Sequence, residues 1–179
     1  MKKGKNVYIR PLTAEDAEAC LKLQTDNHSF FEQFSMERND DFYTLEGQKK
    51  RLQRFYENMQ NDEDYYFGIF HQADDALIGT INLFQILRGS LQSAFIGYFL
   101  DEKHNGKGYT TEAAKLMVEY AFEDLKLHRV EAGVMPRNIA SIRVLEKAGF
   151  HKEGIARKNV KINGKWEDHQ LLAVINPND

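Results

Sequence analysis

The chain has 179 residues, of which 42% are hydrophobic and 28% charged, with three prolines and a formal net charge of −3. This length predicts a single domain over residues 1–179 that buries a core without disulfide or metal staples. The charge gives no basis for a general attraction to nucleic acid or to an anionic membrane. The single cysteine, Cys20, excludes a disulfide framework and a cysteine-based metal site, and we expect it to be a small buried residue on a helix.

The N-terminal segment does not read as a signal peptide. Residues 1–10 contain Lys2, Lys3 and Lys5, but no apolar segment follows them. No uninterrupted apolar run approaches the length of a transmembrane helix. Together with the single cysteine, these features predict a reducing, cytoplasmic setting and no membrane partner.

The first third of the chain predicts one strand and two helices. Residues 7–12 form the expected strand. Thr13, followed three residues later by Asp16, resembles a capping box and predicts the start of the first helix. Residues 45–59 carry the apolar periodicity of the second helix.

An aromatic segment at residues 28–43 separates these two helices. One interpretation is a loop or short helix that packs its own aromatic side chains into the core. The other is a wall of an acceptor pocket, because irregular segments both cover cores and carry sites. The sequence favours neither. The aromatic residues of the segment are Phe30, Phe31, Phe34, Phe42 and Tyr43.

The middle of the chain is rich in strands. They are expected at residues 65–70, 77–84 and 91–100, separated by polar turns. Gly97 lies inside the third of these strands, where glycine indicates either a bulge or a close approach of another backbone.

The second half alternates helices with strands. Asn138 suits the N-cap of a short helix, and Gly149 suits the left-handed position after it. Asn163-Gly164 predicts a two-residue hairpin turn. The order of elements predicts a mixed α/β (α+β) domain with helices packed on one sheet. The expected elements are helices at 110–125 and 138–148, and strands at 129–135, 155–162 and 166–175.

A glycine-containing turn joins the strand at 91–100 to the helix at 110–125. Gly106 and Gly108 can adopt backbone angles closed to other residues and leave no Cβ in the way of a ligand. The unpaired N–H groups and the positive dipole end of the following helix form an anion site suited to a pyrophosphate. A tight connection without a ligand is the plainer alternative. Neither a Walker A loop nor a dinucleotide fingerprint fits these residues.

The same turn, Gly106-Lys107-Gly108-Tyr109 followed by Thr111-Glu112-Ala113, resembles the acyl-CoA pyrophosphate loop of the GNAT superfamily of N-acetyltransferases. The likeness spans nearly the full chain. In particular, the chain resembles the branch that contains the Rim-type ribosomal-protein N-terminal (alanine/serine) acetyltransferases. The further segments that carry it are 10–12, 127–132, 136–141, 145–150 and 153–154.

This resemblance implies a GNAT-like sheet of about seven mostly antiparallel strands, with helices on both faces and splayed central strands. The strands at 95–100 and 129–135 would diverge, and the pantetheine arm of acetyl-CoA would lie between them. Acetyl-CoA would serve as co-substrate, without a metal. The reaction implied is acetyl transfer to a primary amine, and the Rim-type likeness points to a protein N-terminal α-amine.

The resemblance also assigns binding residues. The backbone N–H groups near Phe99 and Leu100 would hold the thioester and polarise its oxygen. The residues expected to bind acetyl-CoA are Phe99, Leu100, Lys103, His104, Asn105, Gly106, Lys107, Gly108, Tyr109, Thr110, Asn138 and Ser141. The residues expected to bind the acceptor are Phe31, Phe34 and Phe95.

Two positions depart from the family pattern. Lys103 stands where the loop commonly has glutamine or arginine. Lysine keeps a hydrogen-bond donor at this position but lacks the planar donor group of those residues. Phe95 stands where many members carry an acidic residue, so the strand lacks its usual general base. A carboxylate in the loop at 32–41, acting through water, is one possible replacement.

Three residues are candidates for catalysis. Ser141 is expected to protonate the leaving thiolate, or else only to cap the first turn of its helix. Tyr98 is the alternative acid, or else a packing residue. Glu112 is a candidate general base, although the helix dipole favours an acid there without any catalytic role. The histidines show no metal-ligand spacing with acids or cysteine, and His104 beside the glycine turn is the one most relevant to the site.

Two further functions compete with acetylation of a protein N-terminus. One is acetylation of small amines such as polyamines or aminoglycosides, for which a deep acidic pocket is expected instead of an open groove. The other is a non-catalytic acyl-CoA-binding regulatory module, a hypothesis that Phe95 sustains. We expect a monomer or a homodimer.

Overall fold

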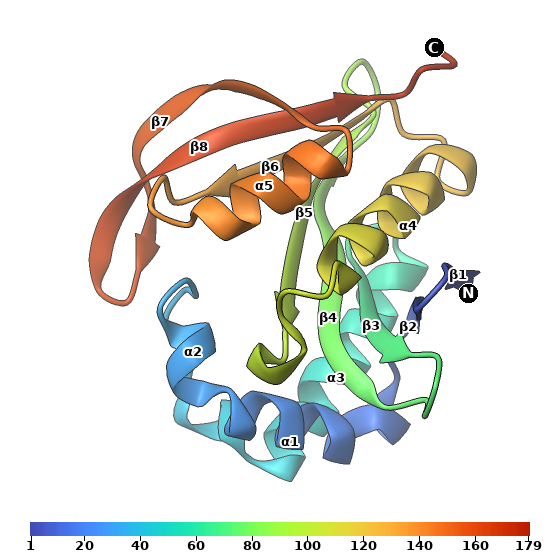
Figure 1. Cartoon of the computed structure of the whole chain (residues 1–179). Coiled ribbons are helices and arrows are strands. Elements are labelled where there is room, and N and C mark those ends of the chain that lie inside the picture. Colours follow the sequence, from blue (N-terminus) through green and yellow to red (C-terminus); the bar gives the residue numbers. More distant parts are fainter.

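A computed structural model describes all residues 1–179 and contains one open sheet in the order β1-β2-β3-β4-β5-β6-β8-β7 (Figure 1). Every neighbouring pair is antiparallel except β5 and β6. The mixed, mostly antiparallel sheet is therefore confirmed, with eight strands because a two-residue strand, β1, lies at one edge. The strands are β1 Lys2–Lys3, β2 Val7–Pro11, β3 Tyr65–His71, β4 Leu77–Leu87, β5 Ser93–Leu100, β6 Arg129–Val134, β7 His151–Ile162 and β8 Lys165–Ile175.

Helices cover both faces of the sheet, as expected (Figure 1). On β3, Phe67 packs against Tyr120 of α4, while its neighbour Tyr66 stacks on Phe55 of α3. Since successive side chains of a strand point to opposite faces, α3 and α4 lie on opposite sides of the sheet. The α-helices are α1 Ala17–Asp26, α2 His28–Glu32, α3 Leu45–Gln60, α4 Tyr109–Glu123 and α5 Ile139–Lys147, with 3₁₀ turns η1 Ala14–Asp16, η2 Asp40–Tyr43 and η3 Glu102–His104.

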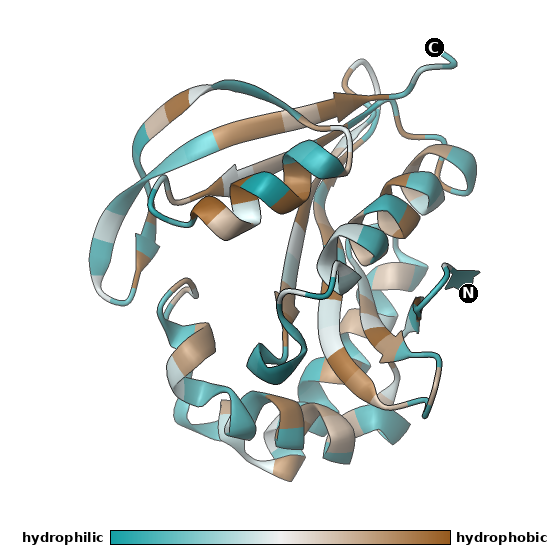
Figure 2. Ribbon diagram, viewed as in Figure 1, coloured by the Kyte–Doolittle hydropathy of each residue, from teal (hydrophilic) through white to brown (hydrophobic).

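Apolar residues gather in the central strands and on the helix surfaces that face them (Figure 2). The larger core cluster contains 22 buried residues, drawn mainly from strands β2 to β6, from β8 and from α4 and α5. A smaller cluster of six lies under α1 and α3 and includes Cys20, which is 2% exposed. Burial raises the pKa of the Cys20 thiol to about 12, so this residue is the inert buried side chain that was predicted. No helix is both long and apolar enough to cross a membrane.

Several local predictions are confirmed. Asn163 and Gly164 have φ angles of +51° and +81° and join Ile162 to Lys165 in a two-residue hairpin. Gly149 ends α5 with a φ of +100°. Asn138 caps the same helix through its side-chain oxygen, which accepts the N–H of Ser141 at 3.3 Å.

Other predictions need correction. The strand predicted at 155–162 begins earlier, at His151, because it pairs along β8 from His151↔Ala173 although its residues are largely exposed and carry no apolar alternation. Gly97 does not form a bulge. It pairs regularly with Asn82, and a Cβ on Gly97 would lie 3.1 Å from Asn82 Oδ1, so a side chain and not another backbone approaches the glycine closely. The bulge of this hairpin lies between Phe84 and Leu87.

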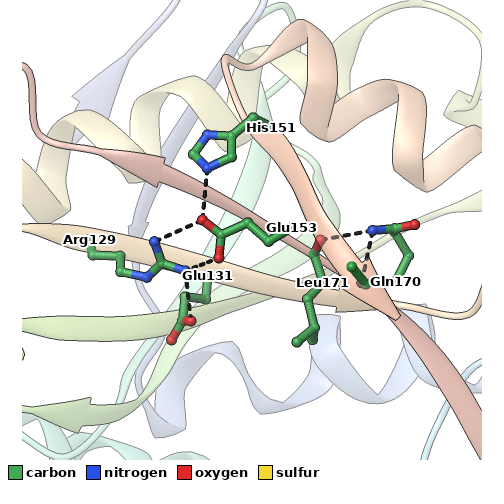
Figure 3. A network of polar contacts seen from close by, with 7 residues as sticks. Arg129, Glu131, His151, Glu153, Gln170 and Leu171 are labelled. Carbon is green, nitrogen blue, oxygen red and sulfur yellow. Dashed lines mark hydrogen bonds and ion pairs between the residues drawn. The ribbon is translucent and has the colours of Figure 1, made fainter. Parts of the chain in front are cut away.

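An ion-pair network links β6 to β7 across β8, at one end of the strand order (Figure 3). Arg129 of β6 contacts Glu131 at 3.1 Å and reaches Glu153 of β7, which also pairs with His151 at 2.8 Å. The hydrogen bonds from Arg129 and then His151 lower the pKa of Glu153 to about 2. The network spans β8 because Glu131 and His151 both pair with Ala173.

Glu112, in the first turn of α4, ties this helix to the start of β2. Its carboxylate accepts the backbone N–H groups of Lys5 at 3.1 Å, Asn6 at 2.9 Å and Val7 at 2.6 Å. Lys5 and Asn6 precede the strand, and their N–H groups have no backbone acceptor. The contacts therefore favour the structural interpretation of Glu112.

We predict that Glu112→Ala lowers the free energy of unfolding by about 2 kcal/mol, because it removes a charged acceptor from several backbone donors. Urea unfolding followed by circular dichroism measures this change. Glu119→Ala on the same helix is the control, since its only ion pair is an exposed one with Lys2 at 3.9 Å. Equal midpoints for the two variants would contradict the structural role.

Candidate active site

The central strands β5 and β6 are joined over only three residue pairs. They pair in parallel from Ser93↔Arg129 to Phe95↔Glu131 and then separate. On its other side, β5 stays paired with β4 as far as Leu100. Likewise, β6 stays paired with β8 as far as Val134. The expected splaying is confirmed, and it leaves two strand edges that face each other without hydrogen bonding.

A cavity of ≈ 150 Å³ occupies this gap. Most of its lining is apolar or backbone, and four polar side chains reach it, from Tyr98, Asn138, Ser141 and His169. No carboxylate lines it. The remaining lining residues are Phe34, Ile96, Gly97, Phe99, Ala132, Gly133, Val134, Met135 and Leu145.

The cavity has two chemically different sides. Tyr98 contacts Ser141 of α5, so its side chain points to the face of the sheet that α5 covers. This side of the cavity is called the α5 side. Its strand neighbour Phe99 points the opposite way and packs on Phe31 of α2, with ring centroids 5.0 Å apart. This second side, to which Phe34 also contributes, is called the α2 side.

On the α5 side, the hydroxyl oxygens of Tyr98 and Ser141 lie 2.6 Å apart. Burial raises the pKa of Tyr98, and the smaller opposing effect comes from the hydrogen bond with Ser141. The phenol therefore stays protonated at neutral pH. The backbone N–H of Ser141 donates to Asn138 Oδ1, the oxygen that caps α5. The Ser141 hydroxyl is therefore not needed for capping and is available to Tyr98.

The glycine turn lies between the end of β5 and the start of α4. Gly106 and Gly108 have φ angles of +81° and +80°, and a Cβ on either would meet no atom within 4 Å. The first helical hydrogen bond runs from Glu112 N–H to the Gly108 carbonyl at 3.1 Å. The N–H groups of 109–111 therefore have no partner within the helix and can bind an anion.

Polar contacts hold the approach to this turn. The N–H of Glu102 donates to Asn27 Oδ1 at 2.9 Å, which fixes η3 to the end of α1. His104 lies behind the turn, with its Nδ1 buried and without a partner, and burial lowers its pKa. Tyr109 contacts His71 at 3.3 Å. Lys103 is exposed and lies 3.8 Å from Asp101.

The structure brings some of the expected acceptor residues to the cavity and not others. Phe34 lines it, whereas Phe31 supports it from behind by packing on Phe99. Phe95 lies outside the lining and packs on Phe84, with ring centroids 5.8 Å apart. The aromatic segment 28–43 therefore both fills the core and forms a wall of the cavity.

His169 lines the cavity although the sequence did not single it out. It is 6% exposed and belongs to β8. Its partner on β7 depends on a bulge between Ala156 and Val160. Counting pairs from the hairpin turn places a different residue opposite His169, so the sequence alone does not show what surrounds it.

A second, more polar cleft has a volume of ≈ 320 Å³, and some of its lining residues are close along the chain to residues that line the cavity. Gln33 and Arg137, which line it, directly neighbour Phe34 and Asn138 of the cavity, and Glu167 lies two residues before His169. Arg137 and Glu167 form an ion pair at 3.3 Å. The other lining residues are Ile162, Asn163 and Lys165 of the β7–β8 hairpin. No group of three or more His, Cys, Asp or Glu side chains is arranged to hold a metal.

Comparison with known proteins identifies the family. Residues 6–151 match the Acetyltransferase (GNAT) domain. The chain belongs to the GNAT acetyltransferase family. It is 68% identical, over 100% of its length and 99% of the relative's, to "Probable N-acetyltransferase YjcK" of Bacillus subtilis. It is 30% identical, over 96% of its length and 88% of the relative's, to the [ribosomal protein uS5]-alanine N-acetyltransferase of Escherichia coli.

Solved structures of other GNAT proteins share the fold of this acetyltransferase. The ribosomal-protein-S5-alanine acetyltransferase of Vibrio fischeri superposes with a TM-score of 0.92 at 32% identity, covering 98% of this chain and 96% of the other. Mycobacterium smegmatis RimJ, in complex with CoA-disulfide, superposes with a TM-score of 0.91 at 26% identity, covering 96% and 83%. GNAT structures of this shape therefore include one that holds a CoA derivative.

We predict that Gly108→Asp weakens acetyl-CoA binding by at least about tenfold, because it adds a negative charge beside the free N–H groups of α4. Isothermal titration calorimetry measures the dissociation constant. Gly89→Asp is the matched control, since Gly89 also has a positive φ, +63°, with open space around it, but lies in the β4–β5 turn. Equal affinities for wild type and Gly108→Asp would refute the phosphate assignment of the turn.

Proposed function

We propose that this GNAT acetyltransferase transfers the acetyl group of acetyl-CoA to a protein N-terminal α-amine. The observation that carries the proposal is the gap between β5 and β6, because it places a proton donor on the α5 side of a cavity that also has an α2 side for a second reactant. Both strand edges offer unpaired backbone groups to an extended ligand, as in peptide recognition by strand addition.

Acetyl-CoA fits the α5 side. Its pyrophosphate matches the free N–H groups at the start of α4, and the pantetheine arm would run between β5 and β6 towards Ser141. In this position the backbone near Phe99 and Leu100 would polarise the thioester carbonyl. Holding the thioester and the amine in line removes much of the entropic barrier to their reaction.

Tyr98 and Ser141 are suited to protonate the leaving thiolate. Their hydroxyl groups share a hydrogen bond at 2.6 Å, and the phenol is held in its protonated form by burial. A proton passed through the pair would reach the sulfur as the carbon–sulfur bond breaks. The pair thus combines the two acids expected separately, with Ser141 nearest the helix cap at Asn138.

The charge of the polar cleft favours a peptide over a polycation. Arg137 and Lys165 line it, and its only carboxylate, Glu167, is paired with Arg137. A polyamine or aminoglycoside carries several positive charges, which this lining would repel, whereas a peptide presents one ammonium group on an extended backbone. The names of the E. coli and V. fischeri relatives, which act on an alanine of a ribosomal protein, support the same acceptor class.

The acceptor class is tested by mass spectrometry after incubation with acetyl-CoA and a mixed panel of free-N-terminus peptides, polyamines and aminoglycosides. We predict acetylation of peptide α-amines, with those beginning in alanine or serine included. Acetylation of small cationic amines alone would replace the protein acceptor with a small molecule. Calorimetric binding of acetyl-CoA without any transfer would instead support the non-catalytic regulatory module.

We predict that Tyr98→Phe lowers kcat about 10²-fold and leaves acetyl-CoA affinity unchanged, because only the proton donor is removed. Ser141→Ala is expected to act in the same direction. Steady-state kinetics with thiol detection measures both. Tyr120→Phe is the control, since this ring packs on Phe67 at 5.0 Å and lies outside the cavity. A wild-type kcat for Tyr98→Phe would remove the pair from the mechanism.

A further inference from the structure

His169 is held in one tautomer by two oxygen atoms. Its Nδ1 lies 2.9 Å from Asn159 Oδ1 and 3.0 Å from the backbone carbonyl oxygen of Glu167. A carbonyl oxygen only accepts hydrogen bonds, so Nδ1 carries the hydrogen. In the neutral ring, Nε2 then has a free lone pair. No group of the chain hydrogen-bonds to Nε2, and it is not among the buried polar atoms that lack a partner.

A bulge in β7 creates this arrangement. Ala156 pairs with His169 and Val160 with Glu167, so residues 157–159 all lie opposite Asp168. Lys158 adopts a φ of +45°, an uncommon angle for a residue other than glycine, and its N–H donates to Asp168 Oδ1 at 2.8 Å. The bulge brings the side chain of Asn159 to Nδ1. Bulges beside active sites commonly serve to redirect a side chain in this way.

The free edge of the ring lies on the α2 side of the cavity. Ala132 and Val134 of β6 belong to the core cluster that includes Leu145 of α5. Gly133 alternates with them and therefore faces away from α5. A Cβ on Gly133 would lie 3.8 Å from His169 Cδ2, the atom bonded to Nε2, so this edge of the imidazole shares that side.

We infer that His169 accepts the proton of the acceptor ammonium group, an assignment that rests on the proposed acetyl transfer. The lone pair of Nε2 lies on the α2 side of the cavity, opposite the Tyr98–Ser141 pair. Protonation makes the ring a cation, and the oxygens of Asn159 and Glu167 already at Nδ1–H stabilise it. His169 thereby replaces the carboxylate that is missing at Phe95.

The proton balance closes with these groups. The acceptor ammonium gives one proton to Nε2, which passes it to solvent. The free amine attacks the thioester carbon, so a nitrogen–carbon bond forms and the carbon–sulfur bond then breaks. The leaving thiolate takes a proton from the Tyr98–Ser141 pair, and the nitrogen, which still carries one proton too many, returns a proton to that pair. The products are an amide, a thiol and one proton released to solvent.

The other titratable groups near the His169 ring are less suited to accept the proton of the ammonium group. Glu167 forms an ion pair with Arg137 at 3.3 Å, and Asp168 accepts a hydrogen bond from the backbone N–H of Lys158. Tyr98 faces the opposite side, where it serves as the acid. Glu112 is occupied with the backbone at the start of β2.

The test compares pH profiles of kcat/KM for wild type and three variants, using an alanine-initiated peptide and acetyl-CoA. We expect His169→Gln to lower kcat/KM about 10²-fold or more without changing acetyl-CoA affinity. Asn159→Asp, which places a carboxylate against Nδ1–H, should move the acid limb of the profile to higher pH. Asn159→Ala, which removes an acceptor of the charged ring, should move it to lower pH. A structural role alone predicts no opposite shifts.

Wild-type kcat/KM in a folded His169→Gln, or an acid limb that stays in place in both Asn159 variants, would overturn the assignment. Absence of peptide acetylation by the wild-type protein would count against the proposed function instead. In that case long-range ¹H–¹⁵N NMR of the histidine side chains decides the inference. A neutral ring protonated at Nε2 contradicts it, whereas protonation at Nδ1, with titration displaced in opposite directions by the two Asn159 variants, supports it.

Discussion

The separation of β5 from β6 is the constraint on which the rest of the site depends. Two parallel strands that part after three residue pairs leave backbone donors and acceptors inside the protein without partners. The sheet tolerates this because β4 and β8 hold the outer edges of both strands to their ends. A ligand with an extended, amide-containing arm supplies the missing partners, so the defect in pairing is itself the binding surface.

The alternation of side chains along each strand places different chemical groups on the two sides of the gap. Because neighbouring side chains point to opposite faces, one strand presents Tyr98 to the α5 side and Phe99 to the α2 side. Gly133 faces the α2 side on β6, next to His169 of β8. An acid and a base can therefore act on the same reacting centre from opposite directions without neutralising each other. The helix starts at α4 and α5 supply the anion site and the cap that positions Ser141.

The sequence predicted those features that local chemistry determines. Asn163-Gly164 required a tight hairpin, and Gly106 and Gly108 required a turn with positive φ. Features set by distant contacts were harder. Glu112 appeared as a possible base because its backbone partners lie over a hundred residues earlier in the chain. His169 was overlooked because its environment depends on a bulge, which shifts the register of β7 in a way that alternation does not reveal.

The central claim is that the gap between β5 and β6 holds the reacting end of acetyl-CoA. A crystal structure of the protein with CoA tests it most directly. The account predicts the pyrophosphate on the N–H groups at the start of α4 and the sulfur in the cavity beside Tyr98 and Ser141. A CoA molecule bound with its sulfur outside this gap, or with its phosphates away from the glycine turn, would contradict it.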